Sequence, residues 1–298
     1  MLKGWYQAAF ESELTDNITA LDIDNRQFII VKDGKAFRVF DAHCPHRGVH
    51  LAAGGIVDKN YIVCPFHGLR IHMGEHPSCE HKIREYPTIS ESGLIFVCLE
   101  DGPETGFTDY LSQLAAGHYI HPGFTMTVRV PFQMIVENAF DNMHFRTVHR
   151  IFNEPDFKMQ ASQNGEFSVK GFFKLPSSQY QKHIPEGQHE LLPYHAIALS
   201  PGIVVSNLGG PSEYYVITTA MPLNETNAVL RLSIAVRREE GKPLPDIDGL
   251  NYLVTKSQKG LMADKHIWEN MNFNLIPRLT KGDAAVIGYQ NFCKPFLF

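Results

Sequence analysis

Two short segments of this sequence each combine one cysteine and one histidine with a proline and a glycine. Residues 44–48 read CPHRG and residues 64–68 read CPFHG, with seventeen residues between the first histidine and the second cysteine. Two thiolates and two imidazoles can hold tetrahedral zinc. They can equally hold a [2Fe–2S] cluster with two cysteines on one iron and two histidines on the other. The pattern predicts one of these two centres, with the ligands Cys44, His46, Cys64 and His67.

A second group of candidate ligands lies along a predicted helix. Apolar residues recur at helical spacing from Phe132 to His144. Asp141 and His144 are three residues apart and therefore share one face of that helix. His149 lies five residues beyond His144, so both histidines can reach one ion only if the helix loosens or ends there. The alternative is that both histidines lie at the surface or cap the helix.

Other cysteines and histidines do not show convincing ligand spacing. His76, Cys79 and His81 could hold another metal, but they lie in a polar loop and are expected at the surface. Cys98 lies in an apolar run and is expected in the core. The five cysteines do not indicate a disulfide framework, because we expect the chain in the reducing cytoplasm. The remaining residues considered and set aside are His43, His50, His72 and Cys293.

Short strands are predicted to position the first motif. They are expected at residues 28–31, 36–40, 61–63 and 94–99. The first two flank Asp33-Gly34, which is a strong hairpin signal. No helical periodicity of useful length occurs in this part of the chain, which is therefore expected to be all-β. Residues 100–106 are polar and rich in turn-forming residues, which predicts a linker.

The rest of the chain mixes strands and helices. Strands are expected at residues 125–130, 167–173, 194–199, 214–219 and 229–236. A long helix is expected over residues 248–272, with Leu253, Leu261 and Trp268 among its apolar residues. Strands followed by a helix that can lie across them indicate an α+β domain.

Composition excludes several classes of protein. The 298 residues are 44% hydrophobic and 20% charged, which is typical of a globular chain. The net charge of −5 and the lack of a basic block make nucleic acid an unexpected partner. No run approaches 18 apolar residues, so no membrane span is expected. The N-terminus shows no signal-peptide pattern, and we expect a cytoplasmic location.

The two groups of residues together resemble a known family. CPHRG followed by CPFHG at this separation resembles the Rieske motif, although many relatives have tryptophan where this chain has Leu69. Residues 137–149 resemble the mononuclear iron site of Rieske non-haem iron oxygenases, in the pattern Glu-Asn-x-x-Asp-x-x-His-x-x-x-x-His. That family completes the site with a distant aspartate. Asp264 is the candidate, because residues 264–270 (DKHIWEN) resemble a segment of ketosteroid hydroxylases; Glu269 is the rival carboxylate.

The resemblance implies a fold and an assembly. It implies an N-terminal all-β Rieske domain over residues 1–104. A helix-grip catalytic domain, an antiparallel sheet with a long C-terminal helix, is expected over residues 105–298. The chain length matches the branch that lacks a β subunit, which includes ketosteroid hydroxylases and O- and N-demethylases and commonly forms head-to-tail trimers. In such a trimer the resemblance makes Asp141 the electron bridge to a Rieske histidine of the neighbouring subunit, with His67 as the expected partner.

The resemblance also implies an activity. The chain would be a terminal oxygenase that uses O₂ to hydroxylate or oxidatively demethylate a hydrophobic small molecule. His144, His149 and Asp264 would hold Fe(II), and Cys44, His46, Cys64 and His67 would hold the [2Fe–2S] cluster. The chain shows no Gly-x-Gly-x-x-Gly fingerprint, so NAD(P)H and flavin are expected on a partner reductase, with or without a ferredoxin. The alternative is a Rieske redox or ligand-binding module without oxygenase activity, which would hold two irons per chain rather than three.

Overall fold

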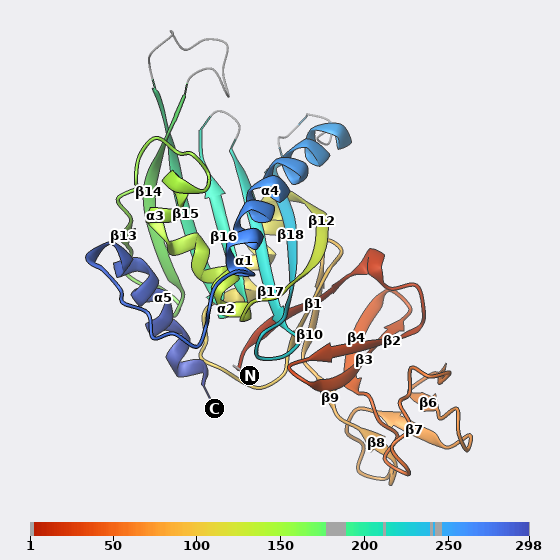
Figure 1. Ribbon diagram of the computed structural model, residues 1–298. Helices are drawn as coiled ribbons and strands as arrows, with labels where there is room; N and C mark the ends of the chain where they lie inside the picture. Colours follow the sequence, from red (N-terminus) through yellow and green to blue (C-terminus); the bar gives the residue numbers. More distant parts are fainter. Residues whose placement is uncertain (1–2, 177–188, 211–212, 239–240, 242–245, 298) are drawn as a thin grey trace.

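The computed structural model describes residues 3–176, 189–210, 213–238, 241 and 246–297. The N-terminal part consists of three small sheets, and the C-terminal part is built on one seven-stranded sheet (Figure 1). Strands β5 to β8 of the N-terminal part lie at one end of the molecule, away from the large sheet and its helices. The α+β architecture predicted from the sequence is therefore confirmed.

Two of the small sheets form the base of the N-terminal part. The first has the order β1-β11-β10, with β1 (Trp5–Phe10), β10 (Thr88–Glu91) and β11 (Leu94–Cys98). The second has the order β2-β3-β4-β9, with β2 (Ile18–Ile23), β3 (Arg26–Asp33), β4 (Ala36–Asp41) and β9 (Glu85–Tyr86). The predicted hairpin is β3–β4, in which Asp33 pairs with Ala36. Gly34 at its turn has a φ of +64°, a conformation that glycine adopts without strain.

The third small sheet carries the two Cys-His segments. Its strands are β5 (Ile56–Asp58), β6 (Tyr61–Val63), β7 (Arg70–Met73) and β8 (Lys82–Ile83). Residues 44–48 follow β4, and residues 64–68 connect β6 to β7. Beneath both loops lies a buried apolar cluster of its own, which includes Leu51, Ile62 and Ile71. The loops therefore stand on a small local core.

The large sheet is antiparallel throughout, with the order β12-β18-β17-β16-β15-β14-β13. Its strands are β12 (His118–Val128), β13 (Lys158–Met159), β14 (Phe167–Pro176), β15 (His189–Ser200), β16 (Ile203–Leu208), β17 (Tyr214–Pro222) and β18 (Ala228–Arg237). Successive side chains of a strand point to opposite faces. In β16, Val204 and Ser206 face a cavity, whereas Ile203 and Val205 pack in the apolar cluster on the other face.

Helices cover both faces of this sheet. They are α1 (Phe107–Gly117), α2 (Phe132–Glu137), α3 (Asn142–Thr147), α4 (Ile247–Trp268) and α5 (Ala284–Cys293). Helix α1 packs in the apolar cluster that contains Ile203 and Val205. Helix α4 crosses the opposite face and contacts β12 and β18, while α5 contacts β13 and β14 (Figure 1). Short 3₁₀ segments complete the chain: η1 (Glu11–Glu13), η2 (Asn138–Phe140), η4 (Lys281–Asp283) and η5 (Lys294–Phe296).

Polar contacts join the small sheets to the large one. Arg231 on β18 is buried, and its Nε lies 3.0 Å from Glu13 Oε2. The same guanidinium donates to the main-chain oxygen of Gln7 on β1 at 3.1 Å. One apolar cluster also includes residues of both parts, among them Tyr6 and Phe132, whose ring centroids are 5.8 Å apart. The two parts therefore share a core.

The structure differs from the sequence prediction in three helical regions. The helix predicted over residues 132–144 is interrupted: α2 and η2 end at Phe140, and α3 begins after Asp141. The long helix predicted over residues 248–272 is α4, and it ends at Trp268. Helices α1 and α5 were not predicted, and α5 follows α4, so the long helix is not the last of the chain. Among the described residues, no helix combines the length and apolar character needed to cross a membrane.

Candidate active site

The two Cys-His segments adopt the same hydrogen-bonding pattern. Cys44 N–H donates to Val49 O at 2.9 Å, and Gly48 N–H donates to Cys44 O at 2.9 Å. In the second loop, Cys64 N–H donates to Leu69 O at 2.8 Å, and Gly68 N–H donates to Cys64 O at 3.0 Å. The repeated pattern makes the loops structural equivalents. Both loops hold their cysteine with the same two backbone hydrogen bonds, whereas the histidine follows the cysteine by two residues in the first loop and by three in the second.

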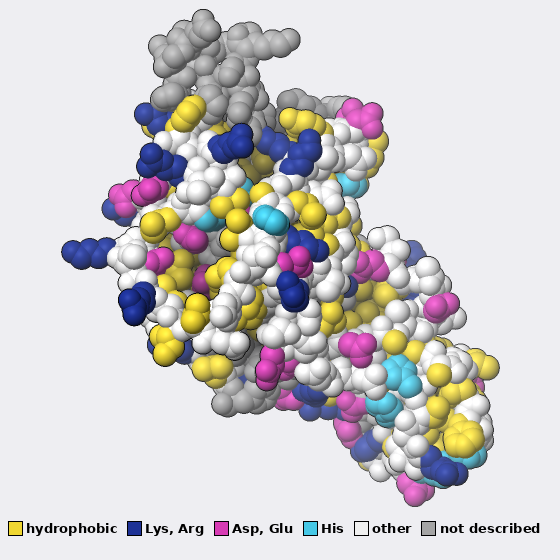
Figure 2. All heavy atoms as spheres, viewed as in Figure 1, with side chains coloured by type: hydrophobic (Ala, Val, Ile, Leu, Met, Phe, Trp, Pro, Cys, Tyr) yellow, Lys and Arg dark blue, Asp and Glu magenta, His cyan; other side chains and the backbone are white. Residues whose placement is uncertain are grey.

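The two kinds of side chain differ in exposure. Both cysteines are buried, and both histidines are exposed, with their ring centroids 5.0 Å apart. Burial and the neighbouring Cys64 thiol raise the pKa of Cys44, which shows that the two thiols face each other. Hydrophobic side chains and histidines gather at this end of the molecule, over β5 to β8 (Figure 2). The exposed Phe66 ring lies 3.8 Å from the His67 ring, centroid to centroid.

The positions of these four side chains fit a two-iron cluster. A [2Fe–2S] cluster of this kind places its two cysteines on one iron and its two histidines on the other. The two loops bring the cysteines together in the interior and the histidines together at the surface, so each kind of ligand occupies its own side of the site. The arrangement therefore favours the cluster over zinc.

The second candidate group is positioned by the break in the predicted helix. Asp141 has φ −80° and ψ 100°, which ends the preceding 3₁₀ turn. Its carboxylate Oδ1 then accepts hydrogen bonds from the N–H groups of Met143, at 3.0 Å, and His144, at 3.4 Å. Asp141 is thus the N-cap of α3. Helix α3 ends at Thr147, and this ending lets His149 turn back towards His144.

The hydrogen bonds of His144 orient its imidazole. Its Nδ1–H donates to the main-chain oxygen of Asp141 at 2.6 Å, whereas the Asp141 carboxylate is 3.8 Å from Nδ1. The Asp141 carboxylate does not accept this bond and caps α3 instead. On the other side of the ring, Asn138 Nδ2 donates to His144 Nε2 at 3.1 Å. Nε2 therefore carries the lone pair, and burial lowers the pKa of His144, which keeps the ring neutral as a ligand requires.

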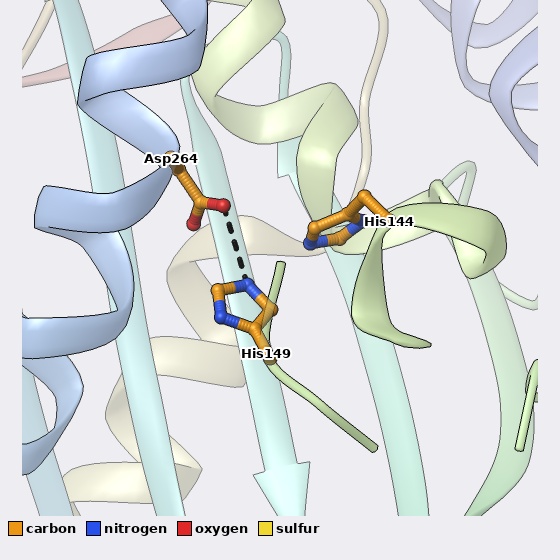
Figure 3. A group of neighbouring side chains, drawn as sticks. All are labelled: His144, His149 and Asp264. Atoms are coloured by element: carbon orange, nitrogen blue, oxygen red, sulfur yellow. Dashed lines mark ion pairs between the residues drawn. The ribbon is translucent and has the colours of Figure 1, made fainter. Parts of the chain in front are cut away.

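Asp264 approaches the two histidines from α4. Figure 3 shows the three side chains pointing toward one another from separate elements. His149 Nε2 lies 3.3 Å from Asp264 Oδ1, and the ring centroids of His144 and His149 are 4.9 Å apart. One ligand atom from each residue lies within 4.8 Å of the other two. Two imidazoles and one carboxylate are the donor set of non-haem Fe(II) sites that keep positions open for oxygen.

The rival carboxylate, Glu269, is directed elsewhere. Glu269 Oε1 accepts a hydrogen bond from the Arg129 N–H at 3.0 Å and lies 3.7 Å from Lys265 Nζ. Asp264, by contrast, is only 4% exposed. A buried carboxylate is costly unless an opposite charge or a metal compensates it. The geometry therefore favours Asp264 over Glu269 as the third ligand.

A cavity of about 700 Å³ opens beside these three residues. His149 and Asp264 form part of its wall, together with Asn138. Most of the remaining wall is apolar or aromatic, and the residues from β14 to β18 and α4 include Phe173, Leu192, Tyr194, Val204, Val216, Leu253 and Leu261. Its volume lies in the range of pockets that enclose small organic ligands. The cavity can therefore hold a hydrophobic molecule against the three-residue group.

An aromatic cluster fixes the wall next to His149. The Phe145 ring lies 5.6 Å from the His149 ring, 4.7 Å from Phe173 and 5.6 Å from Tyr194, centroid to centroid. Tyr194 is fully buried, and its hydroxyl donates to Ala139 O at 2.9 Å. Burial raises the pKa of Tyr194, so the phenol stays neutral. The cluster lines one side of the cavity with aromatic rings that are tilted against one another, with interplanar angles of 47° between Phe145 and Phe173 and 65° between Phe145 and Tyr194.

Comparison with known families agrees with this geometry. Residues 4–88 match the Rieske [2Fe-2S] domain family, and residues 100–292 match the 3-ketosteroid 9alpha-hydroxylase C-terminal domain family. The chain belongs to the Rieske non-haem iron oxygenases.

The oxygenase also resembles individual curated proteins and a solved structure. It is 27% identical to cholesterol 7-desaturase nvd of Xenopus laevis, over 98% of this chain and 71% of that protein. It is 25% identical to a probable 3-ketosteroid-9-alpha-monooxygenase oxygenase component of Rhodococcus rhodochrous, over 89% of this chain and 71% of that protein. The crystal structure of dicamba monooxygenase bound to dicamba matches with a TM-score of 0.73 at 16% identity, covering 98% and 96% of the two chains. That structure supports the fold.

The other cysteines and histidines of the oxygenase have ordinary structural contacts. His43 pairs with His50 in an isolated β-bridge, and His72 Nδ1 lies 3.0 Å from Gly74 O. Cys79 Sγ lies 3.8 Å from the Tyr61 hydroxyl, and burial raises the pKa of Cys98 to about 11. Neither His76 nor His81 joins a three-ligand group within the described residues.

Sequence reasoning did not find the residues that shape the cavity. Asn138 belongs to the motif at residues 137–149, but no role was predicted for it, although its side-chain amide contacts His144. Sequence reasoning also did not identify Phe145, Phe173 or Tyr194 as one wall of a pocket. Alternation along the strands could have separated the two faces of the sheet, but it could not tell which face is hollow.

Proposed function

We propose that this oxygenase is a terminal component that uses O₂, and electrons from a separate NAD(P)H reductase, to hydroxylate or oxidatively demethylate a hydrophobic small molecule. The observation that carries the proposal is the grouping of His144 with His149 and Asp264, the last two of which line a largely apolar cavity. A ferredoxin between reductase and oxygenase is compatible with the exposed Rieske loops. A cytoplasmic location is part of the proposal, because the electrons originate from NAD(P)H.

In this proposal, Cys44, His46, Cys64 and His67 hold the cluster, and His144, His149 and Asp264 hold Fe(II). When bound, the two centres would supply single electrons and the activation of dioxygen. The protein keeps His144 neutral, through the Asp141 carbonyl at Nδ1 and through burial, which lowers the pKa of this imidazole. The aromatic wall of Phe145, Phe173 and Tyr194 excludes water and holds the substrate beside the ligands. We also propose the domain boundary at residues 104 and 105, which the linker between β11 and α1 supports.

The substrate class we favour is a fused-ring lipid of the steroid type. Two of the similar proteins are named as a cholesterol 7-desaturase and as a probable 3-ketosteroid-9-alpha-monooxygenase. The cavity supports this choice because it is large and mostly apolar, with aromatic rings of Phe145, Phe173 and Tyr194 on one side. Smaller methoxyaromatic molecules are the substrates expected if demethylation is the reaction.

We further propose a head-to-tail homotrimer in which Asp141 passes electrons from His67 of a neighbouring subunit. Within one chain, the Rieske loops and the mononuclear site lie at distant positions (Figure 1). Both regions expose apolar side chains: Ile56 and Phe66 are 65% and 58% exposed near the loops. Leu275 and Ile276, beyond α4, are 69% and 92% exposed. Apolar surface of this extent is typical of interfaces, which supports self-association.

The test is turnover by the purified, iron-loaded protein with NADH, a surrogate reductase and a ferredoxin. Ketosteroids, sterols and methoxyaromatic compounds form the substrate panel, and oxygen-18 gas labels the products for mass spectrometry. We expect three irons per chain and one labelled oxygen in a hydroxylated product, or formaldehyde from a demethylated one. A protein with two irons that converts no member of the panel would instead be a redox or ligand-binding module.

A further inference from the structure

One face of α4 forms a wall of the cavity. The residues of α4 on this wall recur every three or four positions. Leu250 and Leu253 lie on this face in the first half of the helix, and Ser257 and Gly260 lie on it closer to Asp264. Gly260 lies one helical turn before Asp264. The cavity therefore reaches the helix backbone directly beside the candidate ligands.

The backbone at Gly260 does not require glycine. Gly260 is within a regular helix and is not among the residues with positive φ. Glycine inside a helix is less favourable than alanine, so its presence here has a cost in helix stability. A Cβ at this position would lie 3.6 Å from His149 Cε1 and 3.8 Å from His149 Nδ1, which is ordinary van der Waals contact. A methyl group fits, but any longer side chain would extend across the His149 ring or into the cavity.

Gly249 provides a contrast on the same helix. It also lines the cavity, and a Cβ there would meet nothing within 4 Å. It lies eleven residues before Gly260, which is about 16 Å along the helix axis. Both glycines thus affect helix stability in the same direction, but only at Gly260 would an added Cβ touch a candidate iron ligand.

We infer that Gly260 is a specificity-determining residue. The missing side chain is the space in which the reacting part of the substrate lies against His149, so residue 260 sets how closely the substrate approaches the iron and which carbon is oxidised. This inference rests on the proposed oxygenase function. It assigns Gly260 a role in positioning the substrate and no role in holding the metal.

Four variants test this inference: Gly260→Ala, Gly260→Leu, Gly249→Ala and Gly249→Leu. The introduced alanine and leucine both favour helix formation. We expect all four to keep the Rieske spectrum and three irons per chain, and to unfold at or above the wild-type temperature. A 3-ketosteroid is the probe, and its binding to the anaerobic protein is followed by tryptophan fluorescence, which needs no turnover. Gly260→Leu should weaken its binding at least tenfold, and Gly249→Leu should weaken it less than threefold. In turnover, Gly260→Ala should change the ratio of oxidised positions, and Gly249→Ala should not.

The possible outcomes separate the inference from the function on which it rests. Equal effects of the two leucine variants on probe binding, or an unchanged product ratio in Gly260→Ala, would overturn the inference. Loss of mononuclear iron in Gly260→Ala would also overturn it, since the residue would then support the metal site. Failure of the wild-type protein to oxidise any compound would contradict the proposed function, while the binding comparison would still decide whether Gly260 bounds the site.

Discussion

The two candidate metal centres of this oxygenase are built in opposite ways. The Rieske loops take all four ligands from residues 44–67, hold them with hydrogen bonds inside each loop and expose both histidines. The mononuclear site joins α3 to α4, places Asp264 in the interior and borders a cavity. The first centre is suited to exchanging electrons with other proteins, and the second to enclosing a substrate. Local backbone geometry thus determines one site, and tertiary packing determines the other.

The largest effect should come from removing a thiolate of the Rieske loops. Cys64→Ser should abolish the visible absorbance and the low-average-g electron paramagnetic resonance signal of the reduced cluster, because serine does not replace thiolate as an iron ligand. Turnover should fall to background. Cys79→Ser, which alters a half-buried cysteine whose thiol lies 3.8 Å from the Tyr61 hydroxyl, is the control and should keep both. A colourless wild-type protein with stoichiometric zinc would contradict the assignment of this centre.

The second-largest effect should show that the mononuclear site can be lost without loss of the Rieske cluster. Asp264→Ala should lower the iron content from three to two per chain and abolish turnover, with the Rieske spectrum unchanged, because the anionic ligand is lost. Glu269→Ala is the matched control on the same helix. It removes partly exposed contacts with Arg129 and Lys265, so iron should be retained and stability should change by less than about 1 kcal/mol. The reverse result in elemental analysis would make Glu269 the ligand.

A smaller effect is expected where the two centres communicate. Asp141→Asn should keep the α3 cap, because asparagine caps helices about as well as aspartate. It removes the negative charge, so single-turnover oxidation of the cluster should slow by about 10- to 100-fold with all three irons present. Asp141→Ala should in addition cost about 1 kcal/mol of folding stability through the lost cap. Wild-type cluster oxidation in Asp141→Asn, or full activity in a proven monomer, would contradict the electron bridge.

The smallest effect concerns the backbone of the Rieske loops. Gly48 and Gly68 have φ values of +74° and +67°, and a Cβ at either position would meet nothing within 4 Å. Gly68→Ala should therefore fold and bind the cluster but lose about 1–2 kcal/mol of stability, since the left-handed conformation disfavours alanine. Denaturant unfolding of the loaded protein measures this loss. If Gly68→Ala were as stable as the wild type, backbone geometry would not determine this site.

The same contrast explains what the sequence could predict. The β3–β4 hairpin and the Cys-His motif are local patterns, and α4 differs from its prediction mainly at its C-terminal end. The break at Asp141 carried a signal, because aspartate is a preferred N-cap, but the continuous apolar spacing from Phe132 concealed it. Helix α1 also had a readable pattern in Phe107, Leu111 and Leu114. The cavity had none, because its wall combines alternate residues of five strands with one face of α4.

Successive side chains of β16 and β17 point to opposite faces of the sheet, so the two faces can change independently during evolution. Val204, Ser206, Val216 and Thr218 face the cavity, whereas Ile203, Val205 and Ile217 face the layer that contains α1. A point mutation on the first set reshapes the binding cavity and leaves the opposite face intact. Substrate preference can therefore diverge between descendants through single substitutions, while the packing of the sheet against α1 is inherited unchanged.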